Sequence, residues 1–219
     1  MMNGILMLVT GMPIILLLYK WTQLLYSQNS DELQDKDKWL AKDKKMRQKD
    51  WLKKSLYIFA TFGIITVIFT NKFSFINIGN VLLFSAYLGM MLNFLYSDLD
   101  QQVIFDKQLV LFACLGLAGA LLNHYPLADH LLAAGAGLLG FLLLSVVTRG
   151  SIGGGDIKLM GALGLWLGLK AIWQVAVGGI LLGGIWALLL ILCKKKGRKD
   201  FVPYSPGFIL CGIIVYLLK

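Results

Sequence analysis

Eight apolar segments, separated by short polar or charged stretches, divide this sequence of 219 residues. Hydrophobic residues make up 58% of the chain and charged residues 15%, which leaves too little polar surface to cover one water-soluble core. In lipid every backbone N–H and C=O group needs a partner within the protein, so a spanning segment is either a helix or a strand of a closed barrel. The alternating pattern of barrel strands is missing. The sequence therefore predicts an all-α polytopic membrane protein.

The predicted transmembrane segments differ in how well they match the thickness of a bilayer. Most reach the length of a crossing, but the sixth has about 13 residues, or roughly 20 Å of helix, against a hydrocarbon core of about 30 Å. The eighth is also short. The eight segments are residues 3–26, 52–70, 75–97, 107–123, 128–148, 157–169, 171–193 and 206–218.

The distribution of positive charge favours a full set of eight crossings. With eight crossings, 18 of the 21 Lys and Arg residues fall on one side, and the other side holds Lys72, Lys170 and Lys219. Lys and Arg mark cytoplasmic loops, so we expect both termini outside and the odd-numbered loops in the cytoplasm. The first 19 residues contain no Lys or Arg, so we expect a retained first span in place of a cleaved signal peptide. The net charge of +9 is accounted for by these loops, and no nucleic-acid partner is expected.

The first cytoplasmic loop, residues 27–51, is the longest polar stretch of the chain. It mixes basic residues with Trp39 and Trp51, as in a helix that lies on anionic lipid headgroups. A solvated run of charge that only sets topology is an equal alternative. We expect two N-terminal helices with this loop in residues 1–70, and a six-helix core in residues 71–219.

Small residues recur along the fourth to seventh segments at spacings that let helix backbones approach closely. They predict tight helix packing and carry no chemistry of their own. The glycines are Gly116, Gly119, Gly135, Gly137, Gly164, Gly168, Gly179 and Gly183.

Four acidic residues, Asp98, Asp100, Asp106 and Asp156, lie at the predicted cytoplasmic ends of apolar spans. Placing an acidic side chain within a membrane costs free energy, so acidic residues found there commonly have a function. Asp156 ends a run of three glycines and precedes the short sixth segment, where an N-cap is the structural alternative. Asp98 closes the third span, where a solvated loop acid is the alternative.

Taken as a pair, Asp98 and Asp156 have the features of an aspartyl hydrolase. Two carboxyls on different helix ends, on one side of the membrane, can act as base toward a water and as acid toward a carbonyl oxygen. Two like charges about 3 Å apart cannot both ionise, so close approach separates these roles.

Three stretches also resemble type IV prepilin peptidases. Residues 153–164 are similar to the GxGD motif of that family and the helix that follows it, and residues 98–106 to its first aspartate box. Residues 202–207 resemble the Pro-containing stretch before the last helix. The resemblance covers residues 98–219, more than half of the chain.

The resemblance implies an intramembrane aspartic endopeptidase in the plasma membrane of a prokaryote. It removes the short basic leader from prepilins or pseudopilins at the cytoplasmic face, with membrane lipids around it. The catalytic aspartates fall on Asp98 and Asp156. The residues expected to bind substrate or to shape the loops are Gly153, Gly155, Asp106 and Lys158.

Three departures from the family narrow this expectation. Phe105 stands where the family usually has Pro. The first loop has no paired CxxC tetrad, and the first helix has no Gly-Ser-Phe-Leu-Asn stretch; both accompany methyl transfer in bifunctional members. We therefore expect peptidase activity without N-methylation, and neither metal nor cofactor. The three cysteines of the chain are interpreted as packing residues.

Other classes of function remain open from the sequence. In a small transporter or channel, Asp98 and Asp156 bind protons or cations, although transporter acids usually lie near the bilayer midplane. A catalytically silent scaffold for pilus or secretion assembly fits the departures from the family. A presenilin-type protease uses similar chemistry, but it has Tyr directly before the first Asp, where this chain has Ser97.

Overall fold

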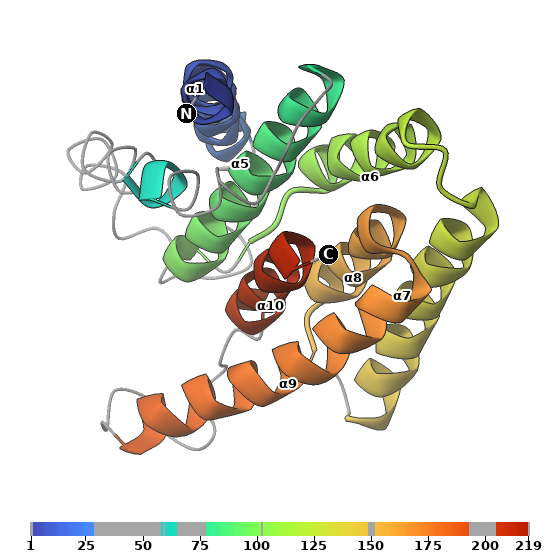
Figure 1. Ribbon diagram of the computed structural model, residues 1–219. Coiled ribbons are helices and arrows are strands. Elements are labelled where there is room, and N and C mark those ends of the chain that lie inside the picture. The colour runs from blue at the N-terminus through green and yellow to red at the C-terminus, as the bar shows by residue number, and fades with distance from the viewer. Residues whose placement is uncertain are drawn as a thin grey trace. The chain divides into compact units, whose positions relative to one another are not determined.

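The computed structural model describes residues 2–28, 58, 60–64, 78–101, 103–148, 152–192 and 205–218. The regular secondary structure in these described residues consists of helices, which confirms the all-α class. The main helices among these residues, coloured along the chain in Figure 1, are α1 (Met2–Gln28), α5 (Ile78–Gln101), α6 (Asp106–Leu122), α7 (Leu127–Val147), α8 (Gly154–Leu167), α9 (Leu169–Leu192) and α10 (Ser205–Leu218).

Among the described residues, three helical stretches are long and apolar enough to cross a membrane. They are Ile78–Leu99 in α5, Leu127–Val147 in α7 and Leu169–Trp186 in α9. Shorter apolar helical stretches lie in Val9–Leu25 and Ser205–Leu218. Residues 29–51 of the predicted basic loop, and most of the predicted second span, lie outside the described residues.

The chain separates into two compact units, Met1–Ser97 and Asp98–Lys219. Within the first unit, the Asn93 side-chain amide of α5 donates to the Thr22 hydroxyl of α1 at 2.8 Å, and Thr22 donates in turn to the Leu18 carbonyl of its own helix. The boundary that we expected near residue 70 stays a prediction, because residues 65–77 are not described.

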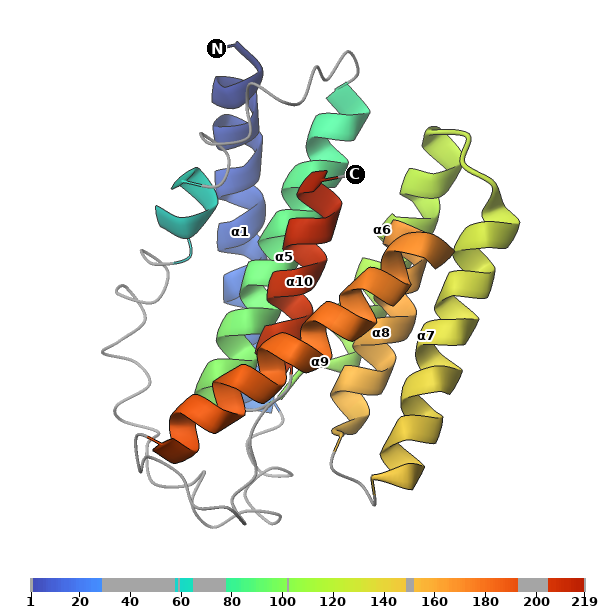
Figure 2. The same ribbon diagram turned by 60° about the horizontal axis from the view of Figure 1, so that its bottom comes forward.

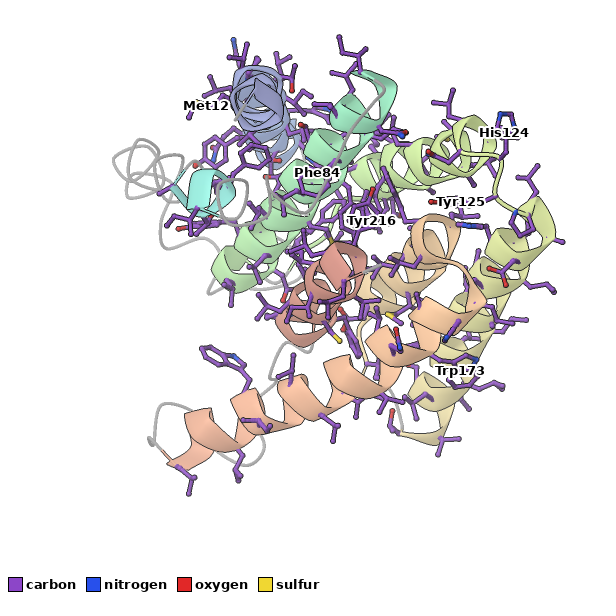
Figure 3. The ribbon with its side chains drawn as sticks, in the orientation of Figure 1. Met12, Phe84, His124, Tyr125, Trp173 and Tyr216 are labelled. Carbon is purple, nitrogen blue, oxygen red and sulfur yellow. The ribbon has the colours of Figure 1, made fainter. Side chains whose placement is uncertain are left out.

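In the second unit α8 occupies the centre and contacts α6, α7, α9 and α10. The Trp166 indole N–H of α8 donates to the Phe112 carbonyl of α6 at 2.8 Å. Tyr216 of α10, labelled in Figure 3, packs edge-on against Trp166 with ring centroids 6.1 Å apart. Figure 2 shows α9 crossing α8 and α10 at a slant, with its C-terminal end extending past them. The N-terminal ends of α8 and α10 lie at the same end of this unit, at the bottom of Figure 2.

Glycines bring α7 and α8 together backbone to backbone. A Cβ added to Gly164 would lie 2.5 Å from the carbonyl of Ala133, and one added to Gly137 would lie 2.6 Å from the carbonyl oxygen of Met160. The prediction of tight packing is confirmed at these two positions. It is wrong for Gly135, where an added Cβ meets nothing within 4 Å.

Candidate active site

The first turn of α8 positions Asp156. Gly153 is the N-cap residue, with extended backbone angles (φ −67°, ψ 148°), and its carbonyl accepts the Asp156 amide hydrogen at 3.1 Å. Asp156 is therefore inside the helix, and the N-cap alternative considered from the sequence is wrong. Its carboxyl group is buried, with the residue 5% exposed, so it does not act as a solvated helix cap.

The first turn of α10 brings a hydroxyl to this carboxyl group. α10 begins at Ser205, and Pro206 suits the first turn because its fixed φ is helical and it has no N–H to satisfy. A Cβ added to Gly207 would lie 2.6 Å from the Gly179 carbonyl oxygen, so the start of α10 packs directly on α9. This packing fixes Ser205, whose hydroxyl donates a hydrogen bond to Oδ1 of Asp156.

Asp98, in the last turn of α5, completes the cluster at the first residue of the second unit. It is 4% exposed and lies close enough to Asp156 for their charges to interact. Its Oδ2 atom has no hydrogen-bond partner among the described residues. The structure thus brings the two predicted catalytic aspartates together, and it adds Ser205.

Burial dominates the electrostatics of Asp156. Removal from water raises the pKa of its carboxyl group above the ordinary value of 3.8, and hydrogen bonds from Ser205 and the Gly153 backbone act in the opposite direction. A buried carboxyl with a raised pKa next to a second acid is typical of acid–base sites.

Asp106 and Lys158 form a separate ion pair. The Lys158 ammonium lies 2.7 and 2.6 Å from the two carboxylate oxygens of Asp106, and both side chains are more than half exposed. Lys158 is two residues after Asp156, so it points to a different side of α8. The pair joins the beginning of α6 to the beginning of α8, and the structure does not bring it into the buried cluster.

The loop before α6 accommodates Phe105 without an unusual backbone. Phe105 is the N-cap residue of α6, is 6% exposed and has φ −78° and ψ 129°. This φ is close to the value that proline imposes. The backbone at Phe105 is therefore one that the proline of the family pattern could also adopt.

A steric clash does not explain glycine at either of the two predicted motif positions. A Cβ on Gly153 would lie 3.7 Å from Oδ2 of Asp156, and one on Gly155 would lie 3.5 Å from Ile104. Both are ordinary contacts. Gly153 nevertheless keeps the space beside the carboxylate open, and Gly155 packs against the loop that leads from Asp98 to α6.

Sequence reasoning missed Ser205. The stretch of residues 202–207 drew attention through its prolines, but a hydroxyl 49 residues after Asp156 has no spacing that links it to the acid. As for metals, the described residues contain no group of three or more His, Cys, Asp or Glu side chains able to hold an ion.

Two buried carboxyls that lie close together can share a single proton and carry out acid–base chemistry on a water and a carbonyl group. A carboxylate deprived of water is a stronger base, and its protonated neighbour is a hydrogen-bond donor. Both acids lie in terminal turns of their helices, Asp98 in the last turn of α5 and Asp156 in the first turn of α8. The geometry therefore suits amide hydrolysis.

Comparison with known proteins gives a family match for part of this chain. Residues 83–188 match the model of the type IV leader peptidase family. The matched residues include Asp98, Gly153, Gly155 and Asp156, whereas Ser205 lies beyond them.

Curated relatives carry the name prepilin leader peptidase/N-methyltransferase. The relative from Bacillus subtilis is 26% identical over 135 residues, which is 60% of this chain and 54% of its own. Those from Aeromonas salmonicida and Neisseria gonorrhoeae are 33% and 30% identical, over 56% and 65% of this chain and 44% and 49% of their own.

The chain thus spans about half the length of the curated relatives it matches. No solved structure matches it. Residues 83–188 are thus similar to the type IV leader peptidase family, and the relatives that match this part of the chain carry the name prepilin leader peptidase/N-methyltransferase.

Proposed function

We propose that this protein is an intramembrane aspartic endopeptidase that removes the basic leader from prepilin or pseudopilin precursors. The observation that carries the proposal is the meeting of Asp98 and Asp156, two buried carboxyls from different helices, at one end of the second unit. The substrate class is supported by the names of the relatives, which match the residues around this pair.

The proposed reaction is hydrolysis of the peptide bond after the leader. One carboxylate takes a proton from a water, whose oxygen bonds to the carbonyl carbon, while the other carboxyl gives its proton to the carbonyl oxygen. The tetrahedral intermediate then releases the amine of the mature pilin as the C–N bond breaks. No metal ion or organic cofactor takes part, and N-methylation is not part of the proposal.

The proposed setting is the plasma membrane of a prokaryote, with eight crossings, the N-terminus outside and the dyad on the cytoplasmic side. The distribution of Lys and Arg supports this orientation. Lipid contact is supported by α7, whose side chains Leu143, Val146 and Val147 are 63%, 72% and 77% exposed. Trp173 on the outer side of α9, labelled in Figure 3, is 62% exposed.

The two remaining site predictions have a supporting function in this proposal. Asp106 and Lys158 shape the loop between α5 and α6 through their ion pair. Gly153 and Gly155 leave the approach to Asp156 open and let α8 begin close to that loop.

Co-expression with a tagged prepilin whose leader ends in Gly tests the proposal. We expect the pilin to lose its leader only when this protein is present, and mass spectrometry of the new N-terminus to show an unmethylated residue. Retention of the leader on several prepilins, with the protein folded in the membrane, would contradict the peptidase function. A methylated terminus would contradict only the exclusion of methyl transfer.

A further inference from the structure

Ser205 brings a buried hydroxyl to the Asp156 carboxyl. Ser205, Asp98 and Asp156 are 3%, 4% and 5% exposed, so none of the three exchanges its partners freely with bulk water. The hydroxyl donates to Oδ1 of Asp156, whereas Oδ2 of Asp98 has no hydrogen-bond partner among the described residues. It comes from α10, outside the residues that match the family model.

The hydrogen-bonding capacity of a hydroxyl makes this arrangement asymmetric. A serine hydroxyl has one hydrogen to donate and two lone pairs that accept. Its one hydrogen is directed to Oδ1 of Asp156, so it is not available to Asp98. A hydrogen bond to a carboxylate is stronger than one to a neutral carboxyl, so Asp156 gains most from the hydroxyl when it is ionised. The buried Oδ2 atom of Asp98 has no such partner among the described residues, which favours the protonated form of Asp98.

On the basis of the proposed peptidase function, we propose that Ser205 is a positioning residue that keeps Asp156 ionised and leaves the shared proton on Asp98. Asp156 is then the base toward water, and Asp98 is the acid toward the scissile carbonyl. The buried Oδ2 atom of Asp98, which has no hydrogen-bond partner among the described residues, is available to face that carbonyl.

The proton balance closes with these roles. Asp156 takes a proton from the attacking water, and Asp98 gives its proton to the carbonyl oxygen, which yields a neutral intermediate with two hydroxyls on one carbon. When the C–N bond breaks, the proton on Asp156 passes to the leaving nitrogen and a hydroxyl proton of the intermediate returns to Asp98. The dyad then has its starting charge, and Ser205 is unchanged.

The charged groups near Asp156 leave Ser205 as a principal source of the asymmetry. The groups that face Asp156 are Asp98 from α5 and the uncharged Ser205 from α10. Asp106 at the start of α6 is neutralised by Lys158 of α8. The Gly153 backbone also stabilises the ionised carboxyl, but any substitution at Ser205 retains that contact.

The test is the dependence of kcat/KM on pH for cleavage of a prepilin by the purified full chain. Ser205→Ala removes the hydroxyl, and Ser205→Thr retains it. Ser145→Ala is the matched control, because it removes a hydroxyl that donates to the Ile152 carbonyl at 3.2 Å near the same end of the unit.

We expect the acid limb of the Ser205→Ala profile to move up by about one pH unit, because a hydrogen bond to a charged group is lost. On the acidic side of the limb kcat/KM then falls about ten-fold. For Ser205→Thr and Ser145→Ala, the acid limb of kcat/KM should lie at the same pH as in the wild type.

An unshifted limb in Ser205→Ala would overturn the inference while leaving the peptidase function in place. An equal shift in Ser205→Thr would overturn it too, because packing and not the hydroxyl would then be responsible. Absence of cleavage by the wild type at every pH would contradict the proposed function, and the assignment of Ser205 would fall with it.

Discussion

The α carbon of Gly153 faces the Asp156 carboxylate at a separation that leaves room for a methyl group: an added Cβ would lie 3.7 Å from Oδ2. The backbone angles at Gly153, φ −67° and ψ 148°, are also accessible to any residue. In the proposed mechanism, residue 153 is therefore glycine because the absent side chain leaves the carboxylate accessible, and not because the backbone is strained.

We expect Gly153→Ala to fold and to cleave at least ten-fold more slowly than the wild type, since the methyl group occupies the space from which water or substrate approaches Oδ2. Gly154→Ala is the control, because a Cβ there meets nothing within 4 Å. Initial cleavage rates and the melting temperature in detergent are the measurements. Equal rates in the two variants would contradict this account of Gly153.

The contact between α7 and α8 makes a prediction about stability. A Cβ on Gly164 would lie 2.5 Å from backbone atoms of Ala133 and Ala134, which cannot move without separating the helices. Overpacking of this kind costs about 1–3 kcal/mol, more than the helix propensity of about 1 kcal/mol that Ala gains over Gly. Gly164→Ala should therefore melt at a lower temperature than the wild type.

Gly140→Ala is the matched control for Gly164, because it also lies within a helix of the second unit and an added Cβ meets nothing within 4 Å. It should melt at the wild-type temperature or above. The same melting temperature for both variants would show that the close approach of α7 and α8 does not limit stability.

The boundaries of α6 and α7 could be predicted because hydropathy changes sharply at their ends, whereas the predicted segment 75–97 differs from α5 by three and four residues. The predicted segments 107–123 and 128–148 differ from α6 and α7 by one residue at each end. The short segment 157–169 is instead α8, Gly154–Leu167, because the helix begins at the glycines before Asp156. Hydropathy gives no weight to Gly154 or Gly155, whereas the backbone hydrogen bonds to the Gly153 carbonyl include them in the helix.

The candidate site was predictable only where a motif ties residues to a known chemistry. Asp98 and Asp156 are linked by resemblance and by their positions at span ends, and the structure brings them together. Ser205 enters through the packing of Gly207 on α9, a contact between segments almost 30 residues apart that no local pattern encodes. Tertiary packing of this kind is not readable from one sequence.

The ion pair of Asp106 and Lys158 makes a prediction about loop shape. Both side chains are more than half exposed, so the pair contributes about 1 kcal/mol at most. Lys158→Asp places two like charges together, and we expect slower cleavage. The double variant Asp106→Lys with Lys158→Asp should recover most of the wild-type rate. A double variant as slow as the single one would indicate that the charges contact substrate.

The raised pKa of Asp156 predicts a pH dependence of stability. Because burial disfavours the ionised carboxyl in the folded state, ionisation of Asp156 lowers the free energy of unfolding. This loss of stability is absent below pH 3.8, the ordinary pKa of the group, and is complete once the pH has risen above the folded-state pKa. Asp156→Asn has no such titration. It should melt above the wild type at pH 8, with a difference that shrinks toward pH 4. A lower melting temperature for Asp156→Asn at pH 8 would contradict the burial argument.

The most direct test of the account is cleavage of a purified prepilin by the wild type, Asp98→Asn and Asp156→Asn, with Asp106→Asn as an acid-to-amide control outside the buried cluster. Loss of an acid or a base that acts in the transition state lowers the rate by about 10²–10⁴. We predict losses of this size for Asp98→Asn and Asp156→Asn in folded protein, and a rate within about three-fold of the wild type for Asp106→Asn, whose ion pair is exposed. Cleavage at a near-normal rate by either Asp98→Asn or Asp156→Asn would contradict the aspartate dyad.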